Sequence, residues 1–194
     1  MEKQRTLIII KPDGVQRGLM GKIIQRFERV GLTVVGFKFI SATKNQIEAH
    51  YPSSQTWLEK VGNRTLTNYQ SSGLEAKKIL NTDIPLEIGR LIKNWLIEYL
   101  QETPVLCVVL EGYESINIIR KHCGDTNPQK ALPGTIRGDF CMDNIELANG
   151  KKRPLRNVIH ASDNPEDAEK EIKVWFKKEE LFDAQRCDEQ IMFD

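Results

Sequence analysis

The chain has 194 residues, which is long enough for one domain with insertions but short for two full domains. Its 28 basic residues nearly balance its 27 acidic residues, and the formal net charge is +1. The composition therefore gives no global electrostatic reason to expect nucleic acid or an anionic membrane as a partner, and any anion site has to be local. The three histidines lie far apart in sequence, so a metal centre built from imidazoles is a poor first hypothesis.

The four cysteines, Cys107, Cys123, Cys141 and Cys187, have neither the paired spacing of metal ligands nor the pattern of a disulfide framework. We therefore expect reduced thiols. The first residues lack a signal-peptide pattern, and no apolar run approaches the length of a membrane span. These features predict a soluble, cytoplasmic protein.

The first quarter of the chain predicts two strands and two helices. A β-branched run over 6–10 stops at KPDG and predicts a buried strand, and apolar residues at helical spacing predict a helix over 20–30. The alternating segment 32–42 predicts a second strand. A capping box from Thr43 to Gln46 then opens a short helix.

The second half predicts helices and strands in alternation. An apolar stripe predicts a helix that begins at Pro85, and the near-continuous apolar run 104–112 predicts a strand. A helix is expected over 113–124, and a long polar loop follows it. The apolar segment 157–162 predicts the fourth strand, and Pro165 opens the last clear helix.

Two segments interrupt this pattern and are interpreted as insertions. Residues 52–83 are polar and irregular and predict at most short helices, while Asn149-Gly150 predicts a protruding hairpin within 142–155. The remaining order of elements fits a βαββαβ, ferredoxin-like core of the α+β class, with a four-stranded antiparallel sheet and helices on one face. We expect a single domain over 1–194.

No glycine-rich phosphate loop or dinucleotide fingerprint occurs in the sequence. Basic and hydroxyl side chains lie instead at predicted strand ends and in loops, namely Lys11, Arg120, Thr126 and Arg137. If they converge, their guanidinium and ammonium groups would hold a polyphosphate. Taken singly, each one fits an ordinary solvated surface residue.

His160 lies at the end of an apolar run, where a lone histidine is more often a hydrogen-bonded core residue than a reactive group. A neutral imidazole is nevertheless a competent nucleophile near pH 7. Glu171, on the following helix, would orient the ring through its second nitrogen, and Ser162 would hold that carboxylate. For Tyr51, core packing of the ring is the simpler interpretation.

Five motifs follow one another along most of the chain: IIIKPDGVQRGLMGKIIQRFE, GDTNP, LPGTIRGDF, NVIHASD and AEKEIKVWF. Together, and in this order, they resemble the nucleoside diphosphate kinases over about 6–51 and 91–182, with an interruption at 142–155. The resemblance implies a ferredoxin-like fold, Mg²⁺-nucleotide substrates and a histidine that is phosphorylated in a ping-pong cycle.

The resemblance also implies roles for individual residues. His160 becomes the nucleophile, with Ser162 and Glu171 as its supports. Lys11 contacts the 3′-hydroxyl of the sugar and assists the leaving oxygen, and Tyr51 lies beside the transferred phosphoryl group. These roles suit phosphoryl transfer, which needs positioning and charge stabilisation more than covalent chemistry from the protein.

The remaining implied contacts are with the nucleotide. Arg120, Thr126 and Arg137 bind the phosphates, and Asn157 contacts the ribose or a phosphate. Mg²⁺ is expected to be carried largely by the phosphates, because the sequence offers no dedicated carboxylate cage.

The sequence departs from the family at the two insertions. The first precedes the helix that usually stacks on the base, where the candidates are Trp95 and Leu96, with Ile92 nearby. The second directly precedes the nucleophile strand and is interpreted as a flap over the site or a subunit contact. Family members are homo-oligomers, commonly hexamers built from dimers, but the insertions leave dimers and tetramers open for this chain.

Two other classes of function compete with this one. A catalytically idle scaffold of the same fold would not need His160, Lys11, Arg120 and Arg137 together. A ferredoxin-like RNA-binding module would show a basic surface and exposed aromatic residues on its strands, and the balanced charge argues against it.

Overall fold

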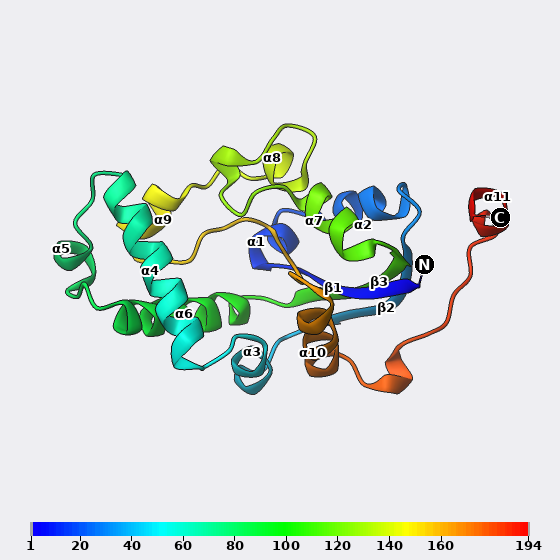
Figure 1. The fold of residues 1–194 in the computed structure, drawn as a ribbon, viewed down its shortest axis with the longest axis horizontal. Helices are drawn as coiled ribbons and strands as arrows, with labels where there is room; N and C mark the ends of the chain where they lie inside the picture. The colour runs from blue at the N-terminus through cyan, green and yellow to red at the C-terminus, as the bar shows by residue number, and fades with distance from the viewer. Residues whose placement is uncertain (1, 194) are drawn as a thin grey trace.

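The computed structural model describes residues 2–193, and its centre is a four-stranded antiparallel sheet of order β2-β3-β1-β4 (Figure 1). The strands are β1 (Lys3–Ile10), β2 (Thr33–Ile40), β3 (Val105–Tyr113) and β4 (Ile159–Ala161). β1 pairs with both β3 and β4, and β2 forms an edge next to β3. This strand order and the alternation with helices confirm the predicted α+β, ferredoxin-like βαββαβ core.

Helices connect these strands and extend beyond the sheet. The α-helices are α1 (Pro12–Gln16), α2 (Met20–Glu28), α3 (Lys44–His50), α4 (Gln55–Ser71), α5 (Ala76–Leu80), α6 (Pro85–Gln101), α7 (Ser115–Cys123), α8 (Ile136–Phe140), α9 (Ile145–Gly150), α10 (Pro165–Trp175) and α11 (Glu189–Phe193). Short 3₁₀ turns lie at Pro128–Lys130 and Lys178–Glu180. The capping box predicted at Thr43 is present at the start of α3.

Both faces of the sheet are covered by helices, so the prediction of helices on one face was incomplete. Ile8 and Ile10 pack with α2 and α7, whereas Leu7 and Ile9 pack toward α3, α6 and α10. Figure 1 shows α2 and α7 on one side of the strands and α3 and α10 on the other. The uninterrupted apolar run of β1 is typical of a strand that is buried on both faces.

The edge strand β2 is less completely covered than β1 and β3. Its pairing with β3 shifts by one residue between Val34 and Gly36, which marks a β-bulge. Beyond the bulge, the side chains of Phe37 and Phe39 are 59% and 53% exposed. This edge therefore presents two large apolar side chains to solvent.

The segment 52–83 corrects the prediction of at most short helices, because it contains the 17-residue helix α4. α4 packs along α6 through small residues. A Cβ atom at Gly62 would lie 1.9 Å from the carbonyl oxygen of Pro85, and one at Gly89 would lie 2.1 Å from that of Leu58. Such close backbone contact leaves little apolar stripe in the sequence of α4, which explains why the pattern did not reveal the helix.

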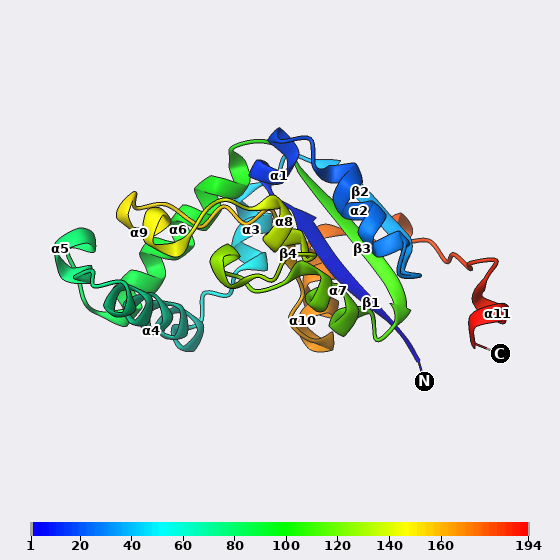
Figure 2. The same ribbon diagram turned by 90° about the horizontal axis from the view of Figure 1, so that it is seen from above.

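The segment 142–155 corrects the prediction of a hairpin. It contains the short helix α9, whose N-terminus is capped by the Asn144 side chain. Asn149 and Gly150 end this helix instead of forming a turn between strands, because Ala148 and Asn149 are buried and the Tyr69 hydroxyl of α4 donates to the Asn149 carbonyl at 3.2 Å. Figure 2 shows α4, α5, α6 and α9 together at one end of the molecule.

Three smaller findings complete the fold. The expected polar loop before the fourth strand contains the helix α8, and α1 follows β1 directly at the KPDG turn. All four cysteines are free thiols, as expected. Among the described residues, no helix combines the length and apolar character that a membrane crossing needs.

The crossing of α4 and α6 yields a stability prediction. Gly89→Ala should lower the free energy of unfolding by about 1–3 kcal/mol, because its Cβ atom meets backbone that has to shift. Urea unfolding followed by circular dichroism measures the change. The matched control is Gly21→Ala in α2, where no atom lies within 4 Å of the new Cβ and alanine favours the helix. Equal effects of the two substitutions would contradict the tight crossing.

Candidate active site

The pairing of β1 with β4 brings together residues from opposite ends of the chain. Ile9 lies opposite His160, and the backbone N–H of Lys11 donates to the carbonyl of Val158 at 2.9 Å. Lys11 therefore leaves the end of β1 next to the start of β4. The sheet register alone places this lysine beside the histidine strand.

An unusual backbone conformation precedes β4. Val158 has φ 57°, in the left-handed region that a β-branched residue rarely adopts. Its N–H donates to the carboxylate of Asp13 at 3.1 Å, and the same carboxylate accepts from the hydroxyl of Tyr99. Asp13 is buried, so this carboxylate stabilises the turn from which the histidine strand begins.

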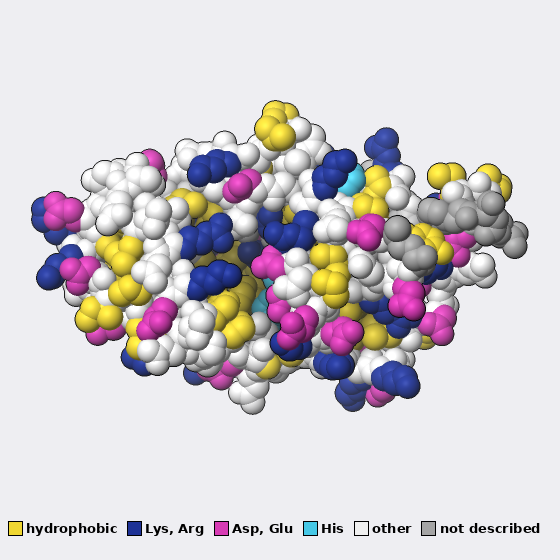
Figure 3. Space-filling view, in the orientation of Figure 1, with side chains coloured by type: hydrophobic (Ala, Val, Ile, Leu, Met, Phe, Trp, Pro, Cys, Tyr) yellow, Lys and Arg dark blue, Asp and Glu magenta, His cyan; other side chains and the backbone are white. Residues whose placement is uncertain are grey.

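A cavity of about 550 Å³ opens beside this strand. Figure 3 shows a hollow in this face that Lys and Arg side chains border and in which a histidine is visible. The side chains that matter for a polyanion come from several elements. The lining includes Lys11, Tyr51, Arg64, Leu96, Arg120, Asp125, Thr126, Arg137, Asn157, His160 and Asp163.

The predicted phosphate-binding residues converge on this cavity. The Lys11 ammonium donates to Asn157 Oδ1 at 2.7 Å, and the Asn157 amide donates to the Thr126 carbonyl at 2.9 Å. This chain of hydrogen bonds holds the ammonium, the amide and the GDTNP loop in one wall of the cavity. Arg120, from α7, adds a guanidinium that pairs with Asp163.

Arg137 is the most buried of the guanidinium groups in this wall. Its two terminal nitrogens donate to the carbonyls of Gly124 and Ile159, each at 2.8 Å. Its Nε atom is buried and has no hydrogen-bond partner among the described residues. A buried donor without an acceptor is costly, and an anion in the cavity would supply one.

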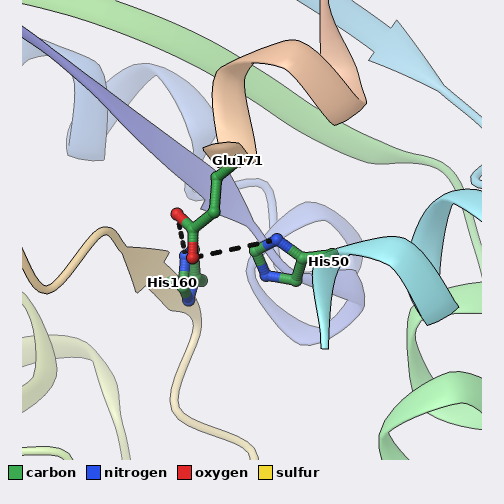
Figure 4. Close-up of side chains that lie close together, drawn as sticks. All are labelled: His50, His160 and Glu171. Carbon is green, nitrogen blue, oxygen red and sulfur yellow. Dashed lines mark hydrogen bonds and ion pairs between the residues drawn. The ribbon is translucent and has the colours of Figure 1, made fainter. Parts of the chain in front are cut away.

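His160 is held from the side of α10. Its Nε2 atom lies 2.9 Å from Glu171 Oε2 (Figure 4). The Ser162 hydroxyl donates to the same oxygen at 2.6 Å. The structure thus brings Glu171 to the ring and Ser162 to Glu171. With Nε2 engaged, the Nδ1 atom is the ring nitrogen that keeps a free lone pair.

His50 is a neighbour of the site that the sequence did not reveal. Its ring packs edge-on against His160 at 4.5 Å between centroids, and its Nδ1 atom lies 3.9 Å from Glu171 Oε1. The nitrogen and oxygen atoms of His50, His160 and Glu171 lie within 4.8 Å of one another, a spacing that metal ligands also show. The Trp175 indole N–H donates to His50 Nδ1 at 3.3 Å, and His50 Nε2 is buried without a hydrogen-bond partner among the described residues.

The environment keeps the imidazole of His160 uncharged. Burial, and then the charge of Lys11, lower its pKa to about 3, and the charges of Arg137 and Arg120 act in the same direction. Burial likewise lowers the pKa of His50 to about 3 and raises the pKa of the Tyr51 phenol. At neutral pH the site therefore holds two neutral imidazoles and a protonated phenol.

Lys11 and Glu171 are shifted as well. Burial, followed by the charge of Arg137, lowers the pKa of Lys11 to about 8, so its ammonium is mostly charged at pH 7. Burial raises the pKa of Glu171 above its ordinary value, against the opposing effects of His50 and Ser162. Shifts of this kind, gathered in a cavity, are typical of functional sites.

The two candidates for base stacking separate in the structure. Leu96 lines the cavity. Trp95 points elsewhere, into the small core between α4 and α6 that contains Tyr69 and Ile88, and it is not among the lining residues. The cavity instead gains Arg64 from α4, a residue that no sequence motif marked. The rotation of α6 about its axis decides that Leu96 and not Trp95 faces the cavity, and the rotation of α4 decides that Arg64 does. The apolar pattern of the sequence did not define either rotation.

Comparison with known proteins gives the family. The model of the family described as "Nucleoside diphosphate kinase" matches residues 4–75 and 89–181. A nucleoside diphosphate kinase of Pyrobaculum aerophilum is 44% identical over 183 residues, which covers 94% of this chain and all of the relative. A crystal structure of an NDP kinase from the same organism superimposes with a TM-score of 0.91 at 43% identity, over 94% of this chain and 100% of that chain.

A second solved relative comes from Borrelia burgdorferi. It is described as a transition-state mimic of nucleoside-diphosphate kinase with bound vanadate and ADP. Its TM-score is 0.76 at 37% identity, over 96% of this chain and 95% of that chain. The family match covers most of the chain, and both relatives exceed 30% identity along nearly their full lengths. The chain thus belongs to the nucleoside diphosphate kinases, phosphotransferases that act on nucleoside di- and triphosphates.

Proposed function

We propose that His160 carries the phosphoryl group between a nucleoside triphosphate and a nucleoside diphosphate in a ping-pong cycle. The lone pair of Nδ1 attacks the γ-phosphorus, the bond from that phosphorus to the β-phosphate oxygen breaks, and the diphosphate leaves. A second diphosphate then attacks the phosphohistidine and restores the free ring. The observation that carries this proposal is the bond between His160 Nε2 and Glu171, which leaves Nδ1 unoccupied beside a cationic wall.

Glu171 and Ser162 support the covalent step. Phosphorylation of Nδ1 makes the ring cationic while Nε2 keeps its proton. A carboxylate that accepts from this N–H stabilises the developing charge and fixes the ring plane. The hydroxyl of Ser162 holds the carboxylate in place at 2.6 Å. Tyr51 lines the same cavity as a neutral phenol beside the transferred group.

The cationic wall binds the phosphates in this proposal. Arg120, Thr126 and Arg137 contact phosphate oxygens, and Asn157 and Lys11 contact the sugar or the bridging region. The unsatisfied Nε donor of Arg137 supports its part. Leu96 offers an apolar surface for the base. A surface that only stacks tolerates all bases, so the diphosphates of adenosine, guanosine, cytidine and uridine should differ modestly as substrates.

Mg²⁺ would be held by the nucleotide phosphates. Within the described lining, Asp125 and Asp163 are the two carboxylates, and Asp163 pairs with Arg120, whereas Mg²⁺ takes six oxygen ligands. The described residues therefore do not fit an all-protein magnesium cage. When it is bound with the nucleotide, Mg²⁺ would neutralise part of the phosphate charge, while Lys11, Arg120 and Arg137 complement the remainder.

The proposal extends to the state of the whole chain. We infer one domain over 1–194 that assembles into a homo-oligomer, with a hexamer first and a dimer or tetramer as alternatives. The exposed Phe37 and Phe39 on the edge strand support self-association, since paired edges and buried aromatic side chains stabilise such contacts. A cytoplasmic location is supported by the four free thiols.

The first prediction tests the nucleophile. His160→Ala should abolish the acid-labile phosphoprotein that forms with labelled ATP and Mg²⁺, because His50, the other neutral imidazole of the site, is buried and is not among the residues that line the cavity. The control is His122→Ala, in a different surface pocket, which should leave labelling intact. A phosphoprotein in the His160→Ala variant would overturn the mechanism. A wild-type chain that takes up no label and binds no nucleotide would favour the idle scaffold.

The second prediction concerns Glu171. Glu171→Gln should slow single-turnover phosphorylation by about 10–100-fold without preventing it, since an amide still orients the ring but stabilises positive charge less well. Rapid-quench measurement of phosphohistidine gives the rate. Glu169→Gln is the matched control, because Glu169 lies on the same helix and is exposed. Identical rates in the two variants would remove Glu171 from the site.

The third prediction follows from the lowered pKa of Lys11. Its ammonium loses its proton as pH rises through about 8, well below the ordinary 10.5. The affinity of the free enzyme for ADP should then fall above pH 8, by up to about tenfold per pH unit. Calorimetric titration between pH 7 and 9.5 measures this. Lys11→Arg keeps its charge and should lose the decline, and a decline that persists would assign the titration to another group.

A further inference from the structure

Arg64 reaches the cavity from a part of the molecule outside the sheet. It is exposed on α4, which α6 supports at the crossing of Gly62 and Gly89 and which the Tyr69–Asn149 contact ties to α9. The other basic residues of the lining belong to the sheet and the elements next to it: Lys11 follows β1, Arg120 lies in α7 and Arg137 lies in α8. The α4–α6 pair therefore adds a cation to a site that the core has already built.

Lys11, Arg120 and Arg137 already have hydrogen-bond or ion-pair partners within the protein. Lys11 donates to Asn157, Arg120 pairs with Asp163, and Arg137 donates to two backbone carbonyls. Arg64 differs from them, because within residues 2–193 no hydrogen-bond acceptor or ion-pair partner is found for its guanidinium. Its five N–H donors are available to a ligand.

Among the described residues, neither acidic residue of the lining forms an ion pair with Arg64. Asp125 accepts from the N–H of Asn127, and Asp163 accepts from Arg120. A guanidinium at the edge of a cavity with no protein acceptor is complementary to an anion that enters the cavity. Phosphate oxygens match its planar fork and bind it bidentately.

We propose that Arg64 binds the phosphate chain of the nucleotide, so that α4 takes part directly in substrate binding. This inference rests on the proposed nucleotide site, and it names a further residue of that site. A base contact is the alternative, since guanidinium groups also recognise the O6 and N7 atoms of guanine. The phosphate is favoured because it carries full charge, whereas every base edge is neutral.

The two contacts predict different patterns of substrate binding. Every nucleoside diphosphate has the same phosphate chain, so a phosphate contact strengthens the binding of all of them equally. A base contact would strengthen the binding of one base over the others. Because Arg64 holds ground state and transition state alike in this proposal, its loss should raise KM and Kd more than it lowers kcat.

The experiment measures binding without the covalent step. In the full-length His160→Ala background, calorimetry gives Kd values for ADP, GDP, CDP and UDP with Mg²⁺. Arg64→Met should raise all four by roughly tenfold or more, by about the same factor for each. The matched control is Arg90→Met, since Arg90 is exposed on α6 and lines none of the described cavities. It should leave the four values unchanged.

Phosphohistidine formation in the His160-containing chain separates the failure modes. The Arg64→Met variant should reach a wild-type rate within about twofold at saturating ATP. Kd values that do not change, or that rise for one base only, would overturn the phosphate contact while the proposed function stands. If the His160-containing chain binds the diphosphates but forms no phosphohistidine, the proposed function fails, and the Kd values still decide the role of Arg64.

Discussion

The buried carboxylate of Asp13 is the interaction on which the site depends. It accepts from the N–H of Val158 and from the hydroxyl of Tyr99. A left-handed conformation at a β-branched residue is unfavourable by about 1–2 kcal/mol, and β4, with three residues, has few ladder bonds to offset it. The carboxylate stabilises this turn and links α6 to it. Because the N–H of Lys11 donates to the carbonyl of Val158 in the same turn, the start of the histidine strand and the position of Lys11 are fixed together.

The charges of the cavity act on His160 in two ways. Burial, together with the charges of Lys11, Arg137 and Arg120, lowers the pKa of the ring and keeps its lone pair free of a proton. In the proposed mechanism, the same charged groups also attract the phosphates of the nucleotide. The neutral state of His50 fits the proposed mechanism, because a second positive charge 4.5 Å from the ring would oppose a phosphohistidine cation on His160.

The sequence predicted the core because its elements carry their own local signals. The apolar runs of β1 and β3, the stripe of α6 and the capping box at Thr43 each define an element without help from the rest of the chain. The motifs also contain the predicted phosphate-binding residues Lys11, Arg120, Thr126, Arg137 and Asn157, which the structure brings into one cavity. Their roles in binding and transfer stay predictions.

What the sequence missed depends on contacts between distant segments. α4 buries Gly62 and Thr65 where an apolar stripe would normally be. Asn149 and Gly150 end α9 instead of forming a hairpin turn, and the Tyr69 hydroxyl of α4 holds the Asn149 carbonyl there. His50 becomes part of the site only through its packing against His160 and Trp175. No pattern within a window of neighbouring residues contains this information.

The hydrogen bond from Tyr69 to the Asn149 carbonyl joins segments 80 positions apart, and it constrains any attempt to make a minimal enzyme. Trimming 142–155 alone would expose the Tyr69 phenol and the part of α4 that contacts α9. Trimming 52–83 alone would expose Ala148 and Asn149 to solvent, although they are only 2% and 8% exposed in the structure. The two segments form one module for engineering and have to be deleted or transplanted together. Removing the module would lower the solubility of the protein before it destabilised the sheet.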